Sequence, residues 1–203
     1  MQDNISTIAM AEELTNAADN GRKVYNIDDY RADYREEHPA VYIGTYRKYN
    51  EGSLFGVWLD ITKFEDYDEF ISVCKFIHRD ETDPELMAQD FECFPESLYY
   101  ESIMGEDTFN KIKEYGELDD DKKEAYMIYL DGGLGKEDIE SFEDAYMGKY
   151  DSEEDYAYQL INECYDIEKM MGNLSSYMDY AAVARDLFIS DYYYEDGHVF
   201  RRC

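Results

Sequence analysis

The chain has 203 residues, of which 49 are Asp or Glu and 19 are Lys or Arg, so its formal net charge is −30. A hydrophobic fraction of 44% and an aromatic fraction of 16% are enough for a packed core, which argues against an acidic disordered chain. A folded surface this negative repels nucleic acid and anionic lipid, and it attracts proteins that have basic grooves.

Neither a signal peptide nor a membrane span is evident. Residues 1–20 lack a basic start and a continuous apolar run, and no stretch approaches the ~18 apolar residues of a transmembrane helix. We therefore expect a cytoplasmic protein without membrane contact. The four cysteines show no close pairing, so we expect free thiols in or near the core at Cys74, Cys93, Cys164 and Cys203.

The first 40 residues read as an extension of the main fold. Residues 5–18 favour a helix, and the polar stretch 19–38 reads as a linker or loosely packed segment that Pro39 closes.

Residues 41–100 are expected to form a small α+β module. Two β-rich runs, 41–46 and 54–60, flank a connection longer than two residues in which Asn50 and Gly52 suit a turn. Residues 87–94 could supply a third strand. Between them a helix capped by Asp66 or Asp68 would carry an apolar stripe of Phe70, Cys74 and Ile77.

From residue 101 onwards the pattern is mostly helical. Glycines follow several of the expected helices and indicate their ends, and Ser152 with Asp155 resembles a capping box. The expected helices are 108–115, 119–130 before Gly132 and Gly133, 136–147 with Ile139, Phe142 and Tyr146 inward and Gly148 as C-cap, one after Ser152 that buries Ala157, Leu160, Ile161 and Cys164, and 181–189 capped by Asp179.

The chain ends with two β-prone runs around Asp196-Gly197, which predict a hairpin with a type I′ turn. The edge of that hairpin must be covered or paired, so a dimer contact near it is expected.

Together these elements predict an α+β fold: a chain of small domains with an N-terminal antiparallel hairpin or sheet plus helix, then mostly helical domains and a C-terminal β-hairpin. The expected division is an extension at 1–40, an α+β domain at 41–100, a short helical domain at 101–138 and an acidic helical domain at 139–203.

Competing chemistries find little support in the residues. A calcium loop starting at Asp151 would place Tyr156 where Gly is needed and Asn162 where a bidentate Glu belongs. Residues 131–138 lack the first Gly and the Ser or Thr of a P-loop, and read better as a helix stop followed by a helix start.

A zinc site is not supported either. Cys74 and His78 lie one turn apart, but two ligands do not make a zinc site, and a core thiol is favoured. We therefore expect no enzyme activity, no cofactor and no metal.

The crowding of carboxylates has a physical interpretation. Four residues of helix rise ~6 Å, close to the spacing of neighbouring phosphates, so carboxylates on successive turns can imitate a phosphate row. Duplex DNA carries one charge per ~1.7 Å, so thirty net negatives match roughly 50 Å of duplex, and a dimer's sixty match roughly 100 Å. The alternative is a solvated acidic surface without a partner.

Three ordered blocks resemble the ArdA antirestriction family. Residues 41–61 resemble the family's opening hairpin, residues 142–160 its acidic stretch and residues 177–200 its C-terminal end. The matching residues include Tyr49, Asn50, Gly52, Gly56, Trp58 and Asp60 in the first block and Phe142, Ala145, Tyr146, Gly148, Tyr150, Ser152, Asp155 and Ala157 in the second. The resemblance covers about residues 41–203, and residues 1–40 depart from it.

The resemblance implies a DNA mimic: an elongated homodimer that occupies the DNA-binding groove of type I restriction–modification enzymes and protects incoming mobile DNA. It would bind no nucleic acid itself. The runner-up function is an acidic adaptor or chaperone for basic proteins. The carboxylates expected to imitate phosphates are Asp119, Asp120, Asp121, Glu140, Glu143, Asp144, Asp151, Glu153, Glu154, Asp155 and Glu163.

Overall fold

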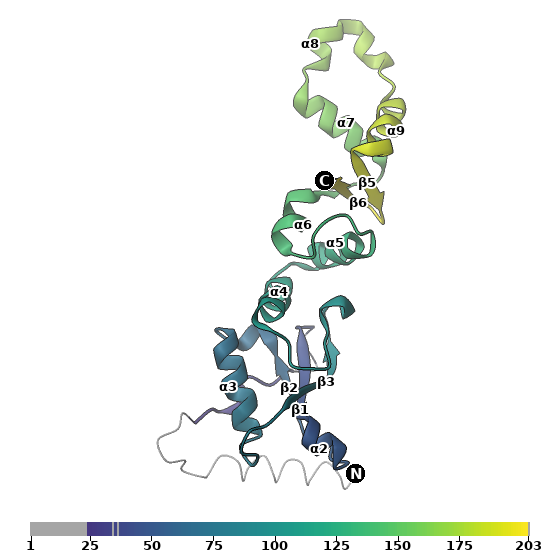
Figure 1. Ribbon diagram of the computed structural model, residues 1–203. Helices are drawn as coiled ribbons and strands as arrows, with labels where there is room; N and C mark the ends of the chain where they lie inside the picture. The colour runs from purple at the N-terminus through teal and green to yellow at the C-terminus, as the bar shows by residue number, and fades with distance from the viewer. Residues whose placement is uncertain (1–23, 34, 36, 203) are drawn as a thin grey trace. The chain divides into compact units, whose positions relative to one another are not determined.

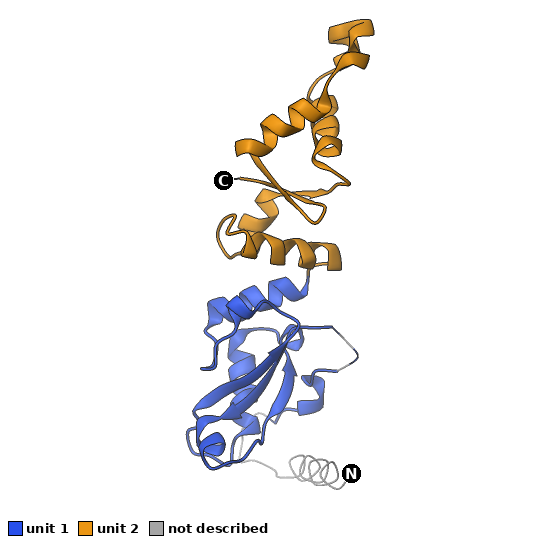
Figure 2. Ribbon diagram, turned by 90° about the vertical axis from the view of Figure 1, so that its right-hand side faces the viewer, with its two compact units in different colours: residues 1–117 blue, residues 118–203 orange. Residues whose placement is uncertain are grey.

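The computed structural model describes residues 24–33, 35 and 37–202, which fall into two compact units divided after Glu117 (Figure 2). We call residues 1–117 unit 1 and residues 118–203 unit 2. Both units combine helices with an antiparallel sheet, which confirms the expected α+β class. The helix expected at 5–18 lies outside the described residues, and the finer division into four domains stays a prediction.

Unit 1 is built on a three-stranded antiparallel sheet in the order β2-β1-β3 (Figure 1). Its strands are β1 (Ala40–Thr45), β2 (Val57–Asp60) and β3 (Leu86–Glu92), so both the expected hairpin and its third strand are confirmed. The long hairpin connection contains a five-residue helix, α2 (Tyr46–Asn50), and turns at Gly52, whose φ of +81° favours glycine.

Aromatic side chains join the sheet of unit 1 to its helices α3 (Tyr67–Ile77) and α4 (Glu106–Gly116). Phe64 follows the short 3₁₀ helix η2 (Ile61–Lys63), and its ring packs against Phe70 of α3 and Phe109 of α4. All three rings are at most 2% exposed. Asp66 is the N-cap of α3, accepting a hydrogen bond from Glu69 N at 2.8 Å. A further 3₁₀ helix, η3 (Glu96–Leu98), precedes α4.

Residues 27–32 pack on unit 1, which makes the expectation of a loosely packed segment wrong at these positions. After the 3₁₀ helix η1 (Ile27–Asp29), the Tyr30 ring stacks on Phe64 with 4.7 Å between centroids. Arg31 forms a bridge with Leu59, and Ala32 N donates to the Trp58 carbonyl. These bonds satisfy the edge of β2 that faces away from β1, which a hydrophobicity pattern does not reveal.

Unit 2 carries a second three-stranded antiparallel sheet, in the order β4-β6-β5, among its helices. Its elements in chain order are α5 (Asp120–Asp131), α6 (Ile139–Ala145), β4 (Tyr146–Lys149), α7 (Glu153–Cys164), α8 (Ile167–Met171), the 3₁₀ helix η4 (Gly172–Tyr177), α9 (Tyr180–Ser190), β5 (Tyr192–Glu195) and β6 (His198–Arg201). Asp196 and Gly197 have φ values of +49° and +88°, and Glu195 pairs with His198, which confirms the type I′ hairpin.

The C-terminal hairpin gains a third strand that the sequence pattern assigned to a helix. The expected helix 136–147 begins only at Ile139 and ends at Ala145, because Tyr146 and Gly148 pair with Phe200 and Val199 of β6. Gly148 has a φ of +113° at an irregularity of this pairing, so it serves the strand and is not a helix C-cap. Phe142 is buried as expected.

Two expectations about buried residues need correction. Cys74 is fully buried, but Cys93 and Cys164 are exposed, and Cys203 lies outside the described residues. In α7 the buried residues are Tyr156 and Ala157, whereas Leu160 and Ile161 are only half-buried. The first half of α7 is therefore the part that packs into unit 2.

We predict that Phe142→Ala destabilises unit 2 by roughly 3–5 kcal/mol, the range for removing a buried aromatic ring. The Phe142 ring is 0% exposed and lies 5.2 Å from Tyr126, 5.4 Å from Tyr146 and 6.5 Å from Phe200, centroid to centroid. Thermal and urea unfolding measure the loss. Asp144→Asn, an exposed position in the last turn of the same helix, is the matched control and should unfold at or above the wild-type temperature, because a negative charge near a helix C-terminus is unfavourable. Wild-type unfolding of Phe142→Ala would contradict the assignment of this ring as a support of unit 2.

Candidate functional site

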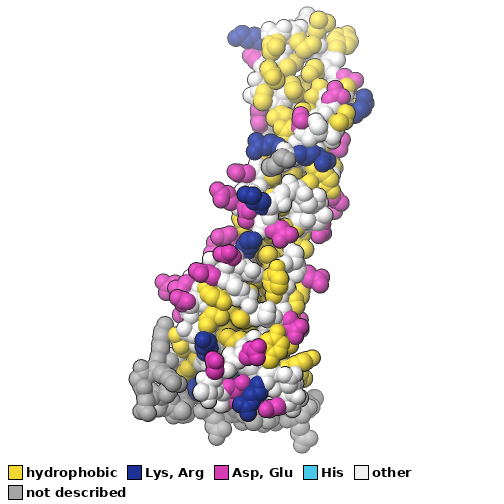
Figure 3. Space-filling view, viewed as in Figure 1, with side chains coloured by type: hydrophobic (Ala, Val, Ile, Leu, Met, Phe, Trp, Pro, Cys, Tyr) yellow, Lys and Arg dark blue, Asp and Glu magenta, His cyan; other side chains and the backbone are white. Residues whose placement is uncertain are grey.

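All eleven carboxylates expected to imitate phosphates are exposed, and all of them lie in unit 2. Figure 3 shows magenta carboxylates on the visible face of this unit, with dark blue Lys and Arg side chains between them. Unit 2 contains 22 Asp and Glu and 8 Lys and Arg, a net charge of −14. The candidate site is therefore a charged surface.

Seven of the eleven carboxylates stand at helix N-termini. The N-terminus of a helix carries a partial positive charge, so acidic side chains there stabilise the helix and remain in water. The seven are Asp119 at the N-cap of α5, Asp120 and Asp121 in its first turn, Glu140 in the first turn of α6, and Glu153, Glu154 and Asp155 in the first turn of α7. Local helix structure thus accounts for part of the crowding without any partner.

Helices α5 and α6 are linked by an ion pair between Lys122 Nζ and a Glu143 carboxylate oxygen at 2.7 Å. On α6, Glu140 and Asp144 are four residues apart and therefore share one face of the helix. The side chains of Asp120, Glu140 and Asp144 form no hydrogen bond or ion pair with the described residues, so their charges are free to meet a partner.

Lys149 of β4 fixes the acidic face of α5. Its ammonium lies 3.2 Å from Asp121 and 3.0 Å from Glu124, and the fully buried His198 approaches the same Glu124 carboxylate at 3.1 Å. Hydrogen bonds from Lys149 and His198 hold the pKa of Glu124 below its ordinary value. Glu124 was absent from the expected site, although its spacing of i+4 from Asp120 and i+3 from Asp121 could have placed it on the same face.

The acidic stretch at the start of α7 contains both capping and free carboxylates. Asp155 accepts a hydrogen bond from the Ser152 hydroxyl at 2.7 Å, and its own N–H donates to that hydroxyl, which confirms the capping motif. Asp151, Glu153 and Glu154 have no side-chain partner among the described residues. Glu163, near the other end of α7, accepts from Gln159 at 2.7 Å.

The other chemistries considered from the sequence do not fit this geometry. Residues 153–164 are helical, a conformation that does not fit a calcium loop starting at Asp151. Gly132 ends α5 and Asp138 caps α6, which confirms the helix stop and helix start at 131–138. Cys74 is a core thiol, as expected. Within the described part of the chain, no cluster of His, Cys, Asp and Glu could hold a metal, and no helix is long and apolar enough to cross a bilayer.

Unit 1 also presents carboxylates that the expected site omitted. Residues 1–117 hold 27 Asp and Glu against 11 Lys and Arg, a net charge of −16. Exposed examples are Glu65, Asp68, Asp90, Glu92, Glu106 and Asp107. The acidic excess of residues 1–117 indicates these carboxylates. They were missed because the densest acidic run, residues 142–158, lies in unit 2.

Exposed carboxylates supported by an aromatic core define a strongly acidic protein, whose surface is complementary to basic rather than acidic partners. The family model of antirestriction protein (ArdA) matches residues 41–200, so this chain belongs to the ArdA family. Membership implies antirestriction directed at restriction–modification enzymes, and proteins of this family are inhibitors without enzyme activity. No curated protein matches the chain.

Proposed function

We propose that this protein is a DNA mimic that occupies the DNA-binding groove of a type I restriction–modification enzyme and so blocks restriction. The observation that carries the proposal is the exposure of all eleven expected carboxylates, several of them without a side-chain partner among the described residues. A groove that binds DNA phosphates with Lys and Arg also attracts carboxylates presented at comparable density.

The spacing of the exposed charges supports the mimicry. Asp120 and Glu124 on α5, and Glu140 and Asp144 on α6, are i,i+4 pairs with a rise of ~6 Å, similar to neighbouring phosphates. The net charge of −14 in unit 2 corresponds to roughly 24 Å of duplex at one charge per ~1.7 Å. Unit 2 alone could therefore replace several base pairs.

The internal ion pairs of unit 2 support the mimicry in a second way. Lys122 and Lys149 hold Glu143, Asp121 and Glu124 in fixed positions, at distances of 2.7–3.2 Å. Carboxylates that are already positioned lose less conformational freedom when a partner binds. Each lysine therefore pairs its own positive charge within unit 2 and orders the carboxylates beside it.

We further propose a homodimer that forms through residues 167–178. Met170, Leu174 and Tyr177 there are 69%, 61% and 82% exposed, and Figure 3 shows hydrophobic side chains gathered at the α8 end of unit 2. The segment contains one acidic and one basic residue, so two copies can meet there without the like-charge repulsion expected elsewhere on unit 2. The contact near the C-terminal hairpin that the sequence suggests stays an alternative interface for the same dimer.

The mimicry is tested by competition with DNA. We expect the protein to bind a type I modification enzyme tightly, to be displaced by duplex DNA and to lose affinity steeply as salt rises, because each contact replaces a phosphate contact. Fluorescence anisotropy with labelled DNA measures the competition. Simultaneous binding of DNA and this protein in the groove would exclude mimicry. Equal affinity for unrelated basic proteins would indicate an acidic adaptor instead.

The distribution of binding energy is tested by charge-neutralising variants. Glu154→Gln alone should change the binding free energy by well under ~1 kcal/mol, because exposed single charge pairs contribute little. Replacing Asp151, Glu153 and Glu154 together by their amides should weaken binding more clearly while Ser152 and Asp155 still cap α7. Titration calorimetry and thermal melts measure both effects. Complete loss of binding in folded Glu154→Gln would show a hot-spot interface.

The dimer is tested by placing a charge in the apolar segment. Leu174→Asp should shift the protein from dimer to monomer, since two buried carboxylates would face one another across an isologous contact. Light scattering after size exclusion measures the mass. Tyr49→Asp, at a 52% exposed position of unit 1, is the control and should leave the dimer intact. A monomeric wild-type protein would refute the dimer without bearing on the acidic surface.

A further inference from the structure

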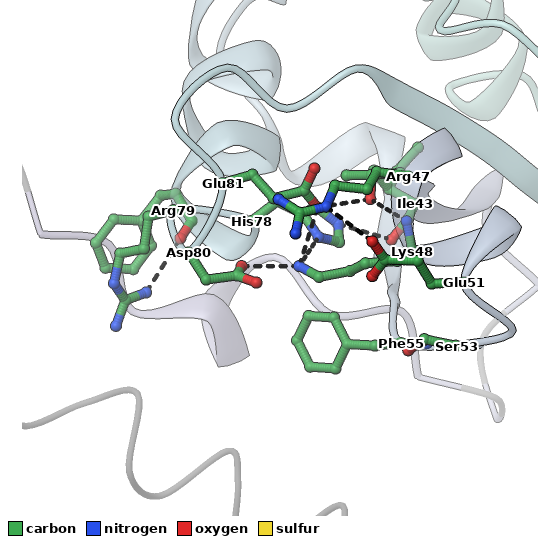
Figure 4. Close-up of polar contacts among 12 residues, drawn as sticks. Ile43, Arg47, Lys48, Glu51, Ser53, Phe55, His78, Arg79, Asp80 and Glu81 are labelled. Atoms are coloured by element: carbon green, nitrogen blue, oxygen red, sulfur yellow. Dashed lines mark hydrogen bonds and ion pairs between the residues drawn. The ribbon is translucent and has the colours of Figure 1, made fainter.

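Unit 1 contains a buried polar cluster where the β1–β2 connection meets the end of α3 (Figure 4). His78 is 0% exposed, and the side chains of Glu81 and Lys48 are 6% and 13% exposed. The family match and the acidic surface assign no role to this cluster. Buried ionisable groups need well-matched partners, so their arrangement determines where each proton lies.

The hydrogen bonds define the protonation state of His78. Its Nε2 atom lies 3.3 Å from the Ile43 carbonyl oxygen, which can only accept, so Nε2 carries a hydrogen. Its Nδ1 atom lies 3.1 Å from Lys48 Nζ, which can only donate. Nδ1 is therefore an unprotonated acceptor, and the imidazole is neutral with both nitrogens satisfied.

Lys48 connects this imidazole to two carboxylates and to the connection between the strands. Its ammonium lies 2.7 Å from Asp80 and 3.4 Å from Glu81, and 4.8 Å from the centroid of the Phe55 ring. The Phe55 ring also packs edge-on against His78, at 5.6 Å. The cluster thus holds both α2 and the following residues 51–56 against the end of α3.

Thr45 completes the attachment. Its hydroxyl donates to Glu81 at 2.7 Å, and the same oxygen accepts the Lys48 N–H at the start of α2. Strand β1 itself is paired on both sides, with β2 and with β3. The connection 46–56 can therefore be released from α3 while the sheet remains paired.

We propose that the cluster of His78, Lys48, Asp80 and Glu81 is an acid-sensitive latch for the connection 46–56. A proton added to His78 Nδ1 would point at the Lys48 ammonium 3.1 Å away and remove its acceptor. Two cations repel each other at this part-buried contact, so Lys48 moves towards solvent, where the Asp80 side chain is already 63% exposed, and its contacts with Glu81 and Phe55 are lost.

The direction of the pH dependence follows from the surroundings of His78. Burial, and then the charge of Lys48, lower the pKa of His78 in the closed form, against the opposing effects of Asp80 and Glu81. Arg47 is turned outward and pairs with Glu51 at 3.1 Å. In the open form the imidazole titrates near its ordinary pKa of 6.5. The open form thus binds the proton more tightly, so the latch is stable above pH 6.5 and weakens as the pH falls below it.

Hydrogen–deuterium exchange of the full-length protein tests the latch. Protection factors of residues 46–56, corrected for intrinsic exchange, should fall about tenfold between pH 7.5 and 5.5, the limit for an imidazole that titrates near 6.5 only when open. Residues 86–92 should keep their protection. His78→Gln, which can still donate to the Ile43 carbonyl but does not titrate, should remove the pH dependence. An unchanged protection of 46–56, or an equal loss in β3, would overturn the proposal.

Lys48→Met tests the part of the latch that depends on the ammonium. Without Lys48, burial still opposes protonation of His78 but the neighbouring positive charge does not, so protection of residues 46–56 should fall less between pH 7.5 and 5.5 than in the wild type. A fall of the wild-type size in this variant would show that Lys48 does not oppose protonation, and the latch would be refuted. Both outcomes are independent of enzyme binding and therefore of the proposed mimicry.

Discussion

The mutual repulsion of carboxylates is the constraint on which the structure of this protein depends. A net charge of −30 on 203 residues destabilises any compact state, and each exposed acidic side chain adds to that cost. The described residues offset it in two ways. Helix N-termini receive seven of the eleven carboxylates of the candidate site, where the backbone supplies local positive charge. Aromatic packing supplies cohesion that does not depend on charge.

Several aromatic residues in each unit pack around one central ring. Phe64 contacts Tyr30, Phe70 and Phe109 in unit 1, while Phe142 contacts Tyr126, Tyr129 and Phe200 in unit 2. Large rings bury much apolar area per residue, which suits small units whose surfaces are committed to carboxylates. Tyr126 and Tyr129 belong to this framework and are almost completely buried, whereas other tyrosines, such as Tyr158 and Tyr177, are exposed.

Local signals in the sequence predicted much of this fold. The caps at Asp66, Ser152 and Asp179 and the turn at Asp196-Gly197 depend on a few adjacent residues, and the structure confirms them. Strand β4 was missed because its residues 146–149 continue a helical pattern, and only pairing with β6, some fifty residues later, makes them a strand. The exposure of Cys164 was missed because packing decreases along α7, from the buried Tyr156 and Ala157 to the half-buried Leu160 and Ile161 and the exposed last residue, Cys164.

The sequence predicted which residues form the candidate site, but not which of their carboxylates are paired with a lysine. Composition and spacing identified eleven carboxylates that are all exposed, yet no local pattern distinguishes Asp121, held by Lys149, from Asp120, which has no partner among the described residues. That distinction arises between elements far apart in the chain, and it matters for recognition. A carboxylate paired internally offers a basic groove an ordered but partly neutralised charge, while a free one offers full charge that must still be ordered. A surface that combines paired and unpaired carboxylates can match a regular row of phosphates. The paired carboxylates keep part of the row ordered before binding, and the unpaired ones supply full negative charge.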